Sequence, residues 1–171
     1  MFSKNFKSLR FMLLIFLVTT FLMNYVLINA YIPSGSMENT IMTGDRVIGL
    51  RFIRHYNRGD IVIFPDPDGG GYYLIKRIIG LPGDIISLDE NGVVTVNGTV
   101  LDEPYVDELA LGECDIKFPY QVPENRYFVL GDHRATSIDS RSSVIGCVEK
   151  NQIVGKVFIR VWPLSSFSLI H

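Results

Sequence analysis

Two residue types that can together hydrolyse an amide bond stand 40 positions apart in this chain. Ser36 lies in the segment PSGSM (33–37), and Lys76 lies in the segment LIKRII (74–79). A serine hydroxyl becomes a nucleophile when a neighbouring base takes its proton. A lysine amine is such a base where burial disfavours its charged form, and the aliphatic neighbours of Lys76 predict burial. The pair indicates serine–lysine hydrolase chemistry.

Histidine is the more usual base for a serine nucleophile, and the chain has His55, His133 and His171. Only His133 has an acid beside it, Asp132, which gives the alternative of a Ser36–His133–Asp132 triad. Adjacent residues of an extended segment point to opposite sides, so Asp132 is poorly placed to orient the His133 ring. The sequence therefore favours the lysine and keeps the triad as an alternative.

A third polar cluster, GDHRATSIDSR, occupies residues 131–141. It supports the reacting pair, or it is a surface loop with an Asp139–Arg141 ion pair. The other motifs have ordinary readings too. PSGS is common in turns, and a strand lysine often packs its stem while its amine stays in water. Each motif alone is weak, whereas the three in this order indicate a hydrolase.

The apolar run before the serine motif predicts a membrane anchor. No Asp, Glu, Lys or Arg occurs in residues 11–37, and 20 residues of helix cover the ~30 Å hydrocarbon core of a bilayer. Basic residues 4, 7 and 10 precede the run, and short basic flanks stay on the cytoplasmic side. We expect residues 1–10 to be a cytoplasmic tail, 11–30 a transmembrane helix and 31–171 an extracytoplasmic domain.

A cleavable signal peptide is the alternative, with Ile28-Asn29-Ala30 as a passable cleavage site. The run is longer than the apolar region of such peptides, which usually has about 7–15 residues. This length favours a retained anchor.

The charge balance argues against nucleic-acid binding. The chain has 16 Lys+Arg and 18 Asp+Glu, and three of the basic residues precede the apolar run, which leaves 13 basic against 18 acidic residues. A nucleic-acid-binding face needs an excess of basic residues to neutralise phosphates. No His, Cys and carboxylate cluster has the spacing of a zinc site, so we expect no metal and no cofactor. Cys114 and Cys147 leave a disulfide or two separate thiols open.

Beyond Tyr31 the sequence predicts a mostly β domain. Short segments rich in branched and aromatic residues alternate with Gly, Pro, Asn and Asp, and no helical period of comparable strength follows the anchor. Residues 89–124 are richer in acids and turn formers, and we expect them to form a small inserted β lobe. The predicted strands are 46–50, 60–64, 72–79, 85–88, 93–96, 99–101, 126–130 and 153–162.

Together these stretches resemble the bacterial type I signal peptidases, which are serine–lysine membrane endopeptidases. The matching blocks, in order along most of the chain, are PSGSM (33–37), GDRV (44–47), GDIVIF (59–64), KRIIGLPGD (76–84) and residues 131–141. The resemblance implies an enzyme with a β catalytic core. It would remove signal peptides from exported preproteins after small residues, at Ala-x-Ala sites, beside the translocation machinery and in the lipid bilayer.

The resemblance also implies the roles of the site residues. Ser36 would attack the scissile carbonyl, with Lys76 as the general base that later protonates the leaving amine. Ser34 would donate to the oxyanion, Ser137 would hydrogen-bond the Lys76 amine, and Gly131 would let the backbone pass close to the site. The supporting residues are Asp132, Arg134, Asp139 and Arg141, and the substrate-pocket residues are Ile32, Met37, Ile41, Leu74 and Ile75.

One residue departs from the family pattern, because the family usually has Asn where this chain has His133. We expect the loop to survive with altered local hydrogen bonding and pH dependence. Two other classes of protein remain. A Ser–Lys autoprotease of the repressor type would need a DNA-binding segment in place of the apolar run. A non-enzymatic anchored β domain would have no reason to combine these three motifs.

Overall fold

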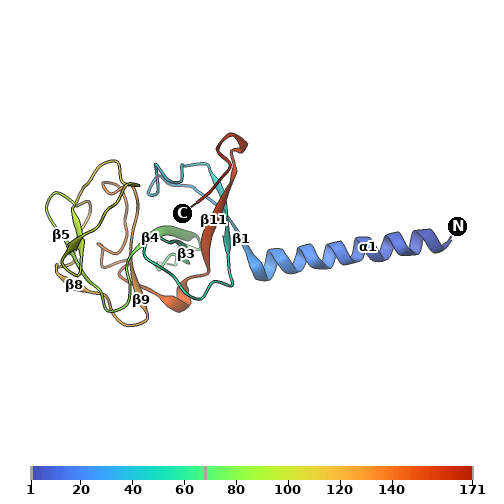
Figure 1. Ribbon diagram of the computed structural model, residues 1–171, viewed down its shortest axis with the longest axis horizontal. Coiled ribbons are helices and arrows are strands. Elements are labelled where there is room, and N and C mark those ends of the chain that lie inside the picture. The colour runs from blue at the N-terminus through green and yellow to red at the C-terminus, as the bar shows by residue number, and fades with distance from the viewer. Residues whose placement is uncertain (1, 68, 171) are drawn as a thin grey trace.

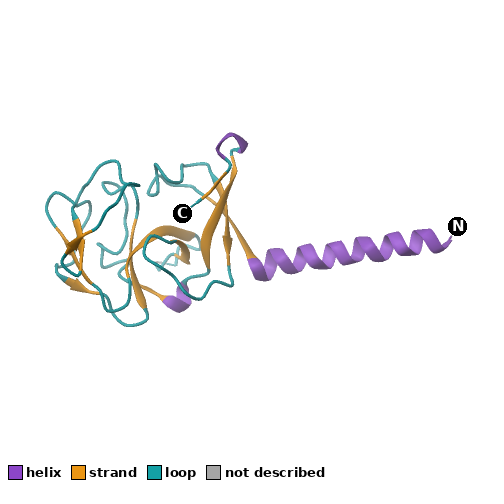
Figure 2. Cartoon of the chain, in the orientation of Figure 1, coloured by secondary structure: helices purple, strands orange, loops and turns teal. Residues whose placement is uncertain are grey.

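A computed structural model describes residues 2–67 and 69–170, and their side chains from residue 8 onward. A single N-terminal helix leads into a domain built from two antiparallel β-sheets (Figures 1 and 2). Two short 3-10 turns, Lys150–Gln152 and Leu164–Ser166, lie between successive strands near the C-terminal end of the domain. The prediction of a mostly β domain behind one apolar helix is confirmed.

The helix α1 (Phe2–Phe21) continues through a π-helical turn, Leu22–Val26, and projects away from the domain (Figure 1). Its stretch Ser8–Val26 is long and apolar enough to cross a membrane by length and composition. Two polar side chains in this stretch donate to carbonyls one turn earlier: Thr19 Oγ1 to Ile15 O at 2.6 Å and Asn24 Nδ2 to Thr20 O at 2.8 Å. Such pairing is what a lipid environment requires of polar groups.

The predicted boundaries of the helix, 11–30, differ from the observed ones. Helical structure begins at Phe2 and ends at Val26, and strand β1 (Leu27–Tyr31) takes up the last four residues of the expected anchor. Ile28 and Ala30 alternate into the core of the sheet, so their apolar character serves strand packing. A continuous apolar run does not reveal where a helical period gives way to an alternating one.

The main sheet has the strand order β1-β2-β11-β3-β4-β9-β10, with β12 beside β11, and every pair is antiparallel. Its central strands, β3 and β4, are almost entirely buried, as expected for segments rich in Ile and Val. Its strands besides β1 are β2 (Arg46–Leu50), β3 (Ile61–Pro65), β4 (Tyr73–Gly80), β9 (Arg126–Leu130), β10 (Val148–Glu149), β11 (Gly155–Trp162) and β12 (Ser168–Leu169).

The smaller sheet has the order β7-β6-β5-β8, made of β5 (Ile85–Leu88), β6 (Val94–Val96), β7 (Thr99–Val100) and β8 (Tyr120–Gln121). The predicted start of this lobe, residue 89, was therefore too late. β5 pairs with β6 and β8, so the strand before the hairpin belongs to the lobe as well. Phe128 of the main sheet packs with Phe118 and Tyr120 of the lobe, so the two sheets share one hydrophobic cluster.

β4 leaves part of one edge open. It pairs with β3 over Tyr73–Arg77, but with β9 only from Arg77 to Gly80. Within the described sheet, the segment 73–76 therefore has a strand partner on one side only. Its last residue is Lys76, which places the candidate base at the end of an unpaired strand edge.

Candidate active site

Ser36 stands on a loop that is closed at its base and packed from within. Ile32 N–H donates to Asp45 O at 3.0 Å, and Gly44 N–H donates to Ile32 O at 2.9 Å. Inside the loop, Met37 and Ile41 are 2 % and 0 % exposed in the main core cluster. Because Met37 and Ile41 are packed in the core, the turn between strand β1 and Met37 is held in place. Ser36, which lies in this turn, therefore has a defined position.

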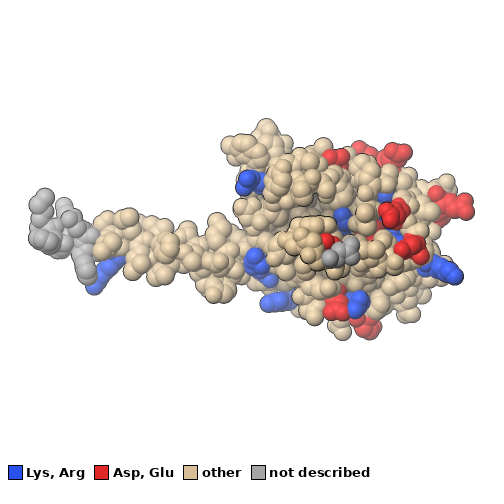
Figure 3. Space-filling view, turned by 180° about the vertical axis from the view of Figure 1, so that it is seen from behind, with Lys and Arg blue, Asp and Glu red and all other residues tan. Residues whose placement is uncertain are grey.

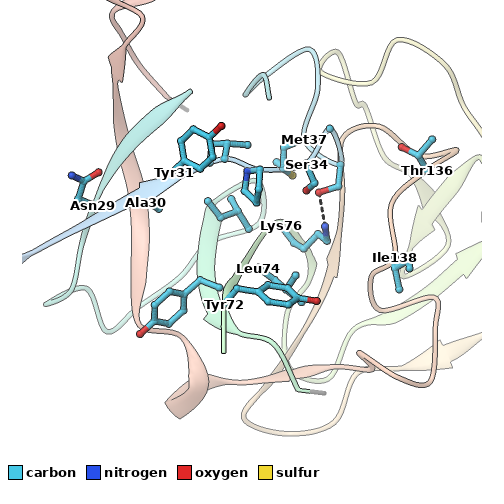
Figure 4. Close-up of a pocket in the computed structure, with 16 residues that line it drawn as sticks. Asn29, Ala30, Tyr31, Ser34, Met37, Tyr72, Leu74, Lys76, Thr136 and Ile138 are labelled. Carbon is cyan, nitrogen blue, oxygen red and sulfur yellow. Dashed lines mark hydrogen bonds between the residues drawn. The ribbon is translucent and has the colours of Figure 1, made fainter. Parts of the chain in front are cut away.

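Lys76 meets this loop directly. Its Nζ lies 2.6 Å from Ser36 Oγ, and this hydrogen bond is the dashed line in Figure 4. Lys76 pairs with Val62 across β3 and β4, and its side chain is buried, with the residue 3 % exposed. The structure therefore contains the expected contact between Ser36 and Lys76.

Burial tunes the lysine for proton transfer. Desolvation lowers the pKa of Lys76 from 10.5 to about 8, with a smaller lowering from Arg141 that Asp139 and Asp132 oppose. The amine therefore loses its proton at a distinctly lower pH than an exposed lysine does. Near neutral pH, a useful fraction of it is free to accept a proton from Ser36 Oγ.

Gly131 brings the polar loop 131–141 against the back of Ser36. A Cβ at Gly131 would lie 2.4 Å from Ser36 O and 2.2 Å from Ser137 Oγ, so only glycine fits there without displacing the backbone. His133 N–H donates to Ser36 O at 3.2 Å, which ties the two loops together. The expected close approach of the backbone at Gly131 is confirmed.

Ser137 departs from its expected contact. Its side chain is buried, and its Oγ has no hydrogen-bond partner among the described residues, so the predicted bond to the Lys76 amine is wrong for this structure. The Lys76 amine instead points at Ser36 Oγ, and the Ser137 hydroxyl packs against Gly131. A buried hydroxyl without a partner costs free energy.

Asp139 and Arg141 form a fully buried, bidentate ion pair. Arg141 Nε lies 2.8 Å from Asp139 Oδ1, and Arg141 Nη2 lies 2.8 Å from Asp139 Oδ2. The two side chains also bind the backbone around them. Gly131 N–H donates to Asp139, and Arg141 donates to Ser137 O and Leu111 O. The pair therefore fixes the loop behind Ser36 and ties it to the inserted lobe.

Asp132 and Arg134 each have a partner that sequence reasoning missed. Arg77 binds Asp132 in a bidentate pair at 2.9 and 2.8 Å, and Arg134 binds Glu103 at 2.9 and 2.5 Å. Side chains alternate along a strand, so Arg77 lies on the face opposite Lys76. This pattern could have indicated that Arg77 has a partner of its own on that face. Glu103 comes from the inserted lobe, and no local pattern pairs it with Arg134.

The His133 alternative lacks the contacts of a triad. Both Asp132 oxygens are engaged by Arg77, with Thr40 Oγ1 also donating to one of them at 2.5 Å. The His133 ring faces Thr136 Oγ1 at 3.1 Å and Glu38 at 3.8 Å. No hydrogen bond joins this ring to Ser36 within the described residues. His55 is exposed and does not line the cleft, and His171 lies outside the described residues.

A cleft of about 680 Å³ opens in front of Ser36 and Lys76 (Figure 4). Four of the five predicted pocket residues line it, but Ile41 does not, because its side chain lies wholly inside the core. Ser34 also lines the cleft and is exposed to it. The predicted lining residues are Ile32, Met37, Leu74 and Ile75, and those that sequence reasoning missed include Tyr31, Tyr72, Tyr73, Thr136 and Ile138.

The remaining reactive groups lie outside this arrangement. Cys114 and Cys147 are free thiols, and burial raises the pKa of Cys147 to about 11. The described part of the chain contains no group of three His, Cys, Asp or Glu side chains that could hold a metal ion.

Comparison with known proteins settles the family. The family described as "Signal peptidase, peptidase S26" matches residues 5–162, which is most of the chain. The chain belongs to this family. It is therefore a serine endopeptidase of the signal peptidase type, as the sequence motifs indicated. Members of the family cleave signal peptides from preproteins.

Similar proteins come from several bacterial organisms. A "Probable signal peptidase I-2" from Synechocystis is 39% identical over 82% of this chain, although the chain spans only 65% of that relative. "Signal peptidase I P" from Bacillus subtilis subsp. natto is 35% identical over 89% of this chain and 86% of its own length. A crystal structure of a signal peptidase I from Enterococcus faecalis V583 aligns at 32% identity over 61% of this chain and 97% of that chain, with a TM-score of 0.49.

The pair between Glu103 and Arg134 in this signal peptidase yields a stability prediction. Glu103→Gln leaves the Arg134 guanidinium, whose side chain is 0% exposed, without its charged partner. Breaking such a buried pair should lower the free energy of unfolding by about 3–5 kcal/mol, measured by chemical denaturation in detergent. Glu108→Gln, at an exposed site of the same lobe, is the matched control and should change it by less than about 0.5 kcal/mol. Equal effects of the two variants contradict the inference.

Proposed function

We propose that this signal peptidase cleaves preproteins with Ser36 as the nucleophile and Lys76 as the general base. The observation that carries the proposal is the 2.6 Å contact between a buried lysine amine and a serine hydroxyl in an open cleft. The lowered pKa of Lys76, about 8, supports it, because a charged amine cannot accept the serine proton.

The reaction proceeds by acyl transfer through the serine. Lys76 takes the proton of Ser36 Oγ as the oxygen attacks the scissile carbonyl and a tetrahedral oxyanion forms. Collapse of this intermediate breaks the C–N bond, and Lys76 returns the proton to the leaving amine of the mature protein. Water, deprotonated by Lys76, then hydrolyses the acyl-enzyme and releases the signal peptide.

The oxyanion needs donors beside Ser36, and we assign this role to the Ser34 hydroxyl and the Ser36 N–H. Ser34 lies two residues before the nucleophile and is exposed to the same cleft (Figure 4). Asp139, Arg141, Asp132 and Arg134 hold the loop behind the nucleophile. We assign Ser137 to the same support, since its buried hydroxyl lies under Gly131.

Substrate binding follows from the open edge of β4. An extended peptide can add to the segment 73–76 as a further strand, because that segment has an unpaired edge facing the cleft. The alternate side chains of the peptide then enter apolar pockets lined by Ile32, Met37, Leu74 and Ile75. Shallow apolar pockets at alternate positions favour small residues, which fits cleavage after Ala-x-Ala sites.

Membrane topology completes the proposal. The stretch Ser8–Val26 would span the bilayer, with the basic tail in the cytoplasm and the catalytic domain outside, beside the translocation machinery. On the face seen in Figure 3, acidic side chains gather mainly on the half of the domain away from α1, whereas basic side chains lie both near the helix and at the far end of the domain. Tethering raises the effective concentration of enzyme at its membrane-bound substrate.

Site variants test the pair directly. Ser36→Ala and Lys76→Ala should each abolish cleavage of a model preprotein with an Ala-x-Ala site while the protein stays folded, because neither variant retains both nucleophile and base. Cleavage is followed by gel shift and the product by N-terminal sequencing. Ser87→Ala and Lys117→Ala, outside the cleft, are the matched controls and should keep full activity. Full activity of Lys76→Ala would place the base elsewhere, with His133 as the next candidate.

The buried lysine predicts a pH dependence of activity. Because protonated Lys76 cannot accept the serine proton, kcat/KM should rise with pH along a limb with an apparent pKa of about 8. The buried ammonium also destabilises the folded state below about pH 8, and this penalty fades as pH rises towards 10.5. Lys76→Met should therefore raise the free energy of unfolding at pH 7 more than at pH 10. A limb near 10.5 contradicts the assignment.

Ser34 offers a test of the oxyanion site. Ser34→Ala should lower kcat by about 10²–10³-fold with little change in KM, since the donor acts mainly in the transition state. Ser34→Thr keeps the hydroxyl and should retain most of the activity. A loss that appears in KM alone would assign Ser34 to ground-state binding.

A further inference from the structure

The active-site cleft has two ends of different composition. Asn29, Ala30, Tyr31 and Tyr72 lie to one side of Lys76, and Thr136 and Ile138 lie to the other (Figure 4). β1 follows α1 and its π-helical turn in the chain, so the first end is the one nearer the membrane helix. The second end is built by the loop 131–141.

Ile138 is held outward at this second end. It is 49% exposed, whereas its neighbours Ser137 and Asp139 are 1% and 0% exposed. Arg141 holds both neighbours, because it donates to Ser137 O and forms the buried ion pair with Asp139. The exposed aliphatic side chain is therefore presented to the cleft by a rigid loop and contributes little to the core.

We propose that Ile138, with Thr136 at its rim, forms the subsite for the side chain of one of the first two residues of the mature protein. This inference rests on the proposed function. If the signal-peptide side of the substrate occupies the pockets before Ser36, then the residues after the scissile bond must pass Lys76, which protonates the leaving amine. The side chains beyond Lys76 in the cleft are those of Thr136 and Ile138.

The chemistry of this subsite selects against charge. An aliphatic surface gains free energy from an apolar partner and offers a charged side chain no counter-ion. Thr136 Oγ1 is 3.1 Å from His133 Nδ1, so the polar rim already has a partner of its own. We expect preproteins with an uncharged residue at this position to be cleaved about tenfold faster than those with Asp or Lys, the scale of discrimination by a small apolar contact.

A charge-swap experiment tests the subsite. Preproteins identical except for Val, Asp or Lys at the first or the second mature position are cleaved by the full-length enzyme, by Ile138→Asp and by Ile138→Lys. Ile138→Asp should favour Lys over Asp at one of these positions, and Ile138→Lys should reverse that order, with the Lys/Asp ratio of kcat/KM changing about tenfold or more in each direction. Any uniform effect of the new charge on Lys76 cancels in this ratio.

Val144→Asp is the matched control, because Val144 is 50% exposed and does not line the cleft. It should leave the Lys/Asp ratio at the wild-type value. An unchanged ratio in both Ile138 variants, at both mature positions, overturns the subsite while cleavage at the Ala-x-Ala site leaves the proposed function intact. Failure of the wild-type enzyme to cleave any of these preproteins overturns the proposed function itself.

Discussion

The site depends on keeping the Lys76 amine out of water while it stays within hydrogen-bond distance of Ser36 Oγ. Burial disfavours the ammonium form, and this desolvation lowers the pKa to about 8. Three elements around the pair bury the amine and keep it close to the serine. β4 carries the lysine inward, the closed loop around Met37 and Ile41 brings the serine to it, and the backbone at Gly131 closes the space behind.

The same burial brings other charges into the interior, and they are paired. Arg141 is matched by Asp139, and neither side chain is exposed to solvent. Their effects on Lys76 oppose each other, since Asp139 raises the pKa of the lysine and Arg141 lowers it. Desolvation remains the largest influence on the pKa of Lys76. Buried pairs of this kind destabilise the fold when either partner is lost, which makes the support of the site sensitive to single substitutions.

The inserted lobe belongs to this support. Glu103 pairs with Arg134, and the ring of Tyr105 lies 3.9 Å from the guanidinium of Arg77. Arg141 also donates to the backbone carbonyl of Leu111. The inserted lobe is a continuous segment of the chain, but its residues contact the buried arginines beside the site. It is therefore part of the structural support of the site. The cleft itself stays open along residues 73–76 of β4, where the described sheet has no strand partner on that side.

The sequence by itself determined the family motifs, the apolar helix, most of the strands and the pairing of Ser36 with Lys76. These features rest on local pattern and residue chemistry, which a single chain displays directly. Tertiary structure decided the end of the helix at Val26, the partners of buried arginines, the burial of the Ser137 hydroxyl and the exposure of Ile138. Each of these depends on which distant segments meet, because burial and pairing are properties of contacts that spacing along the chain does not encode.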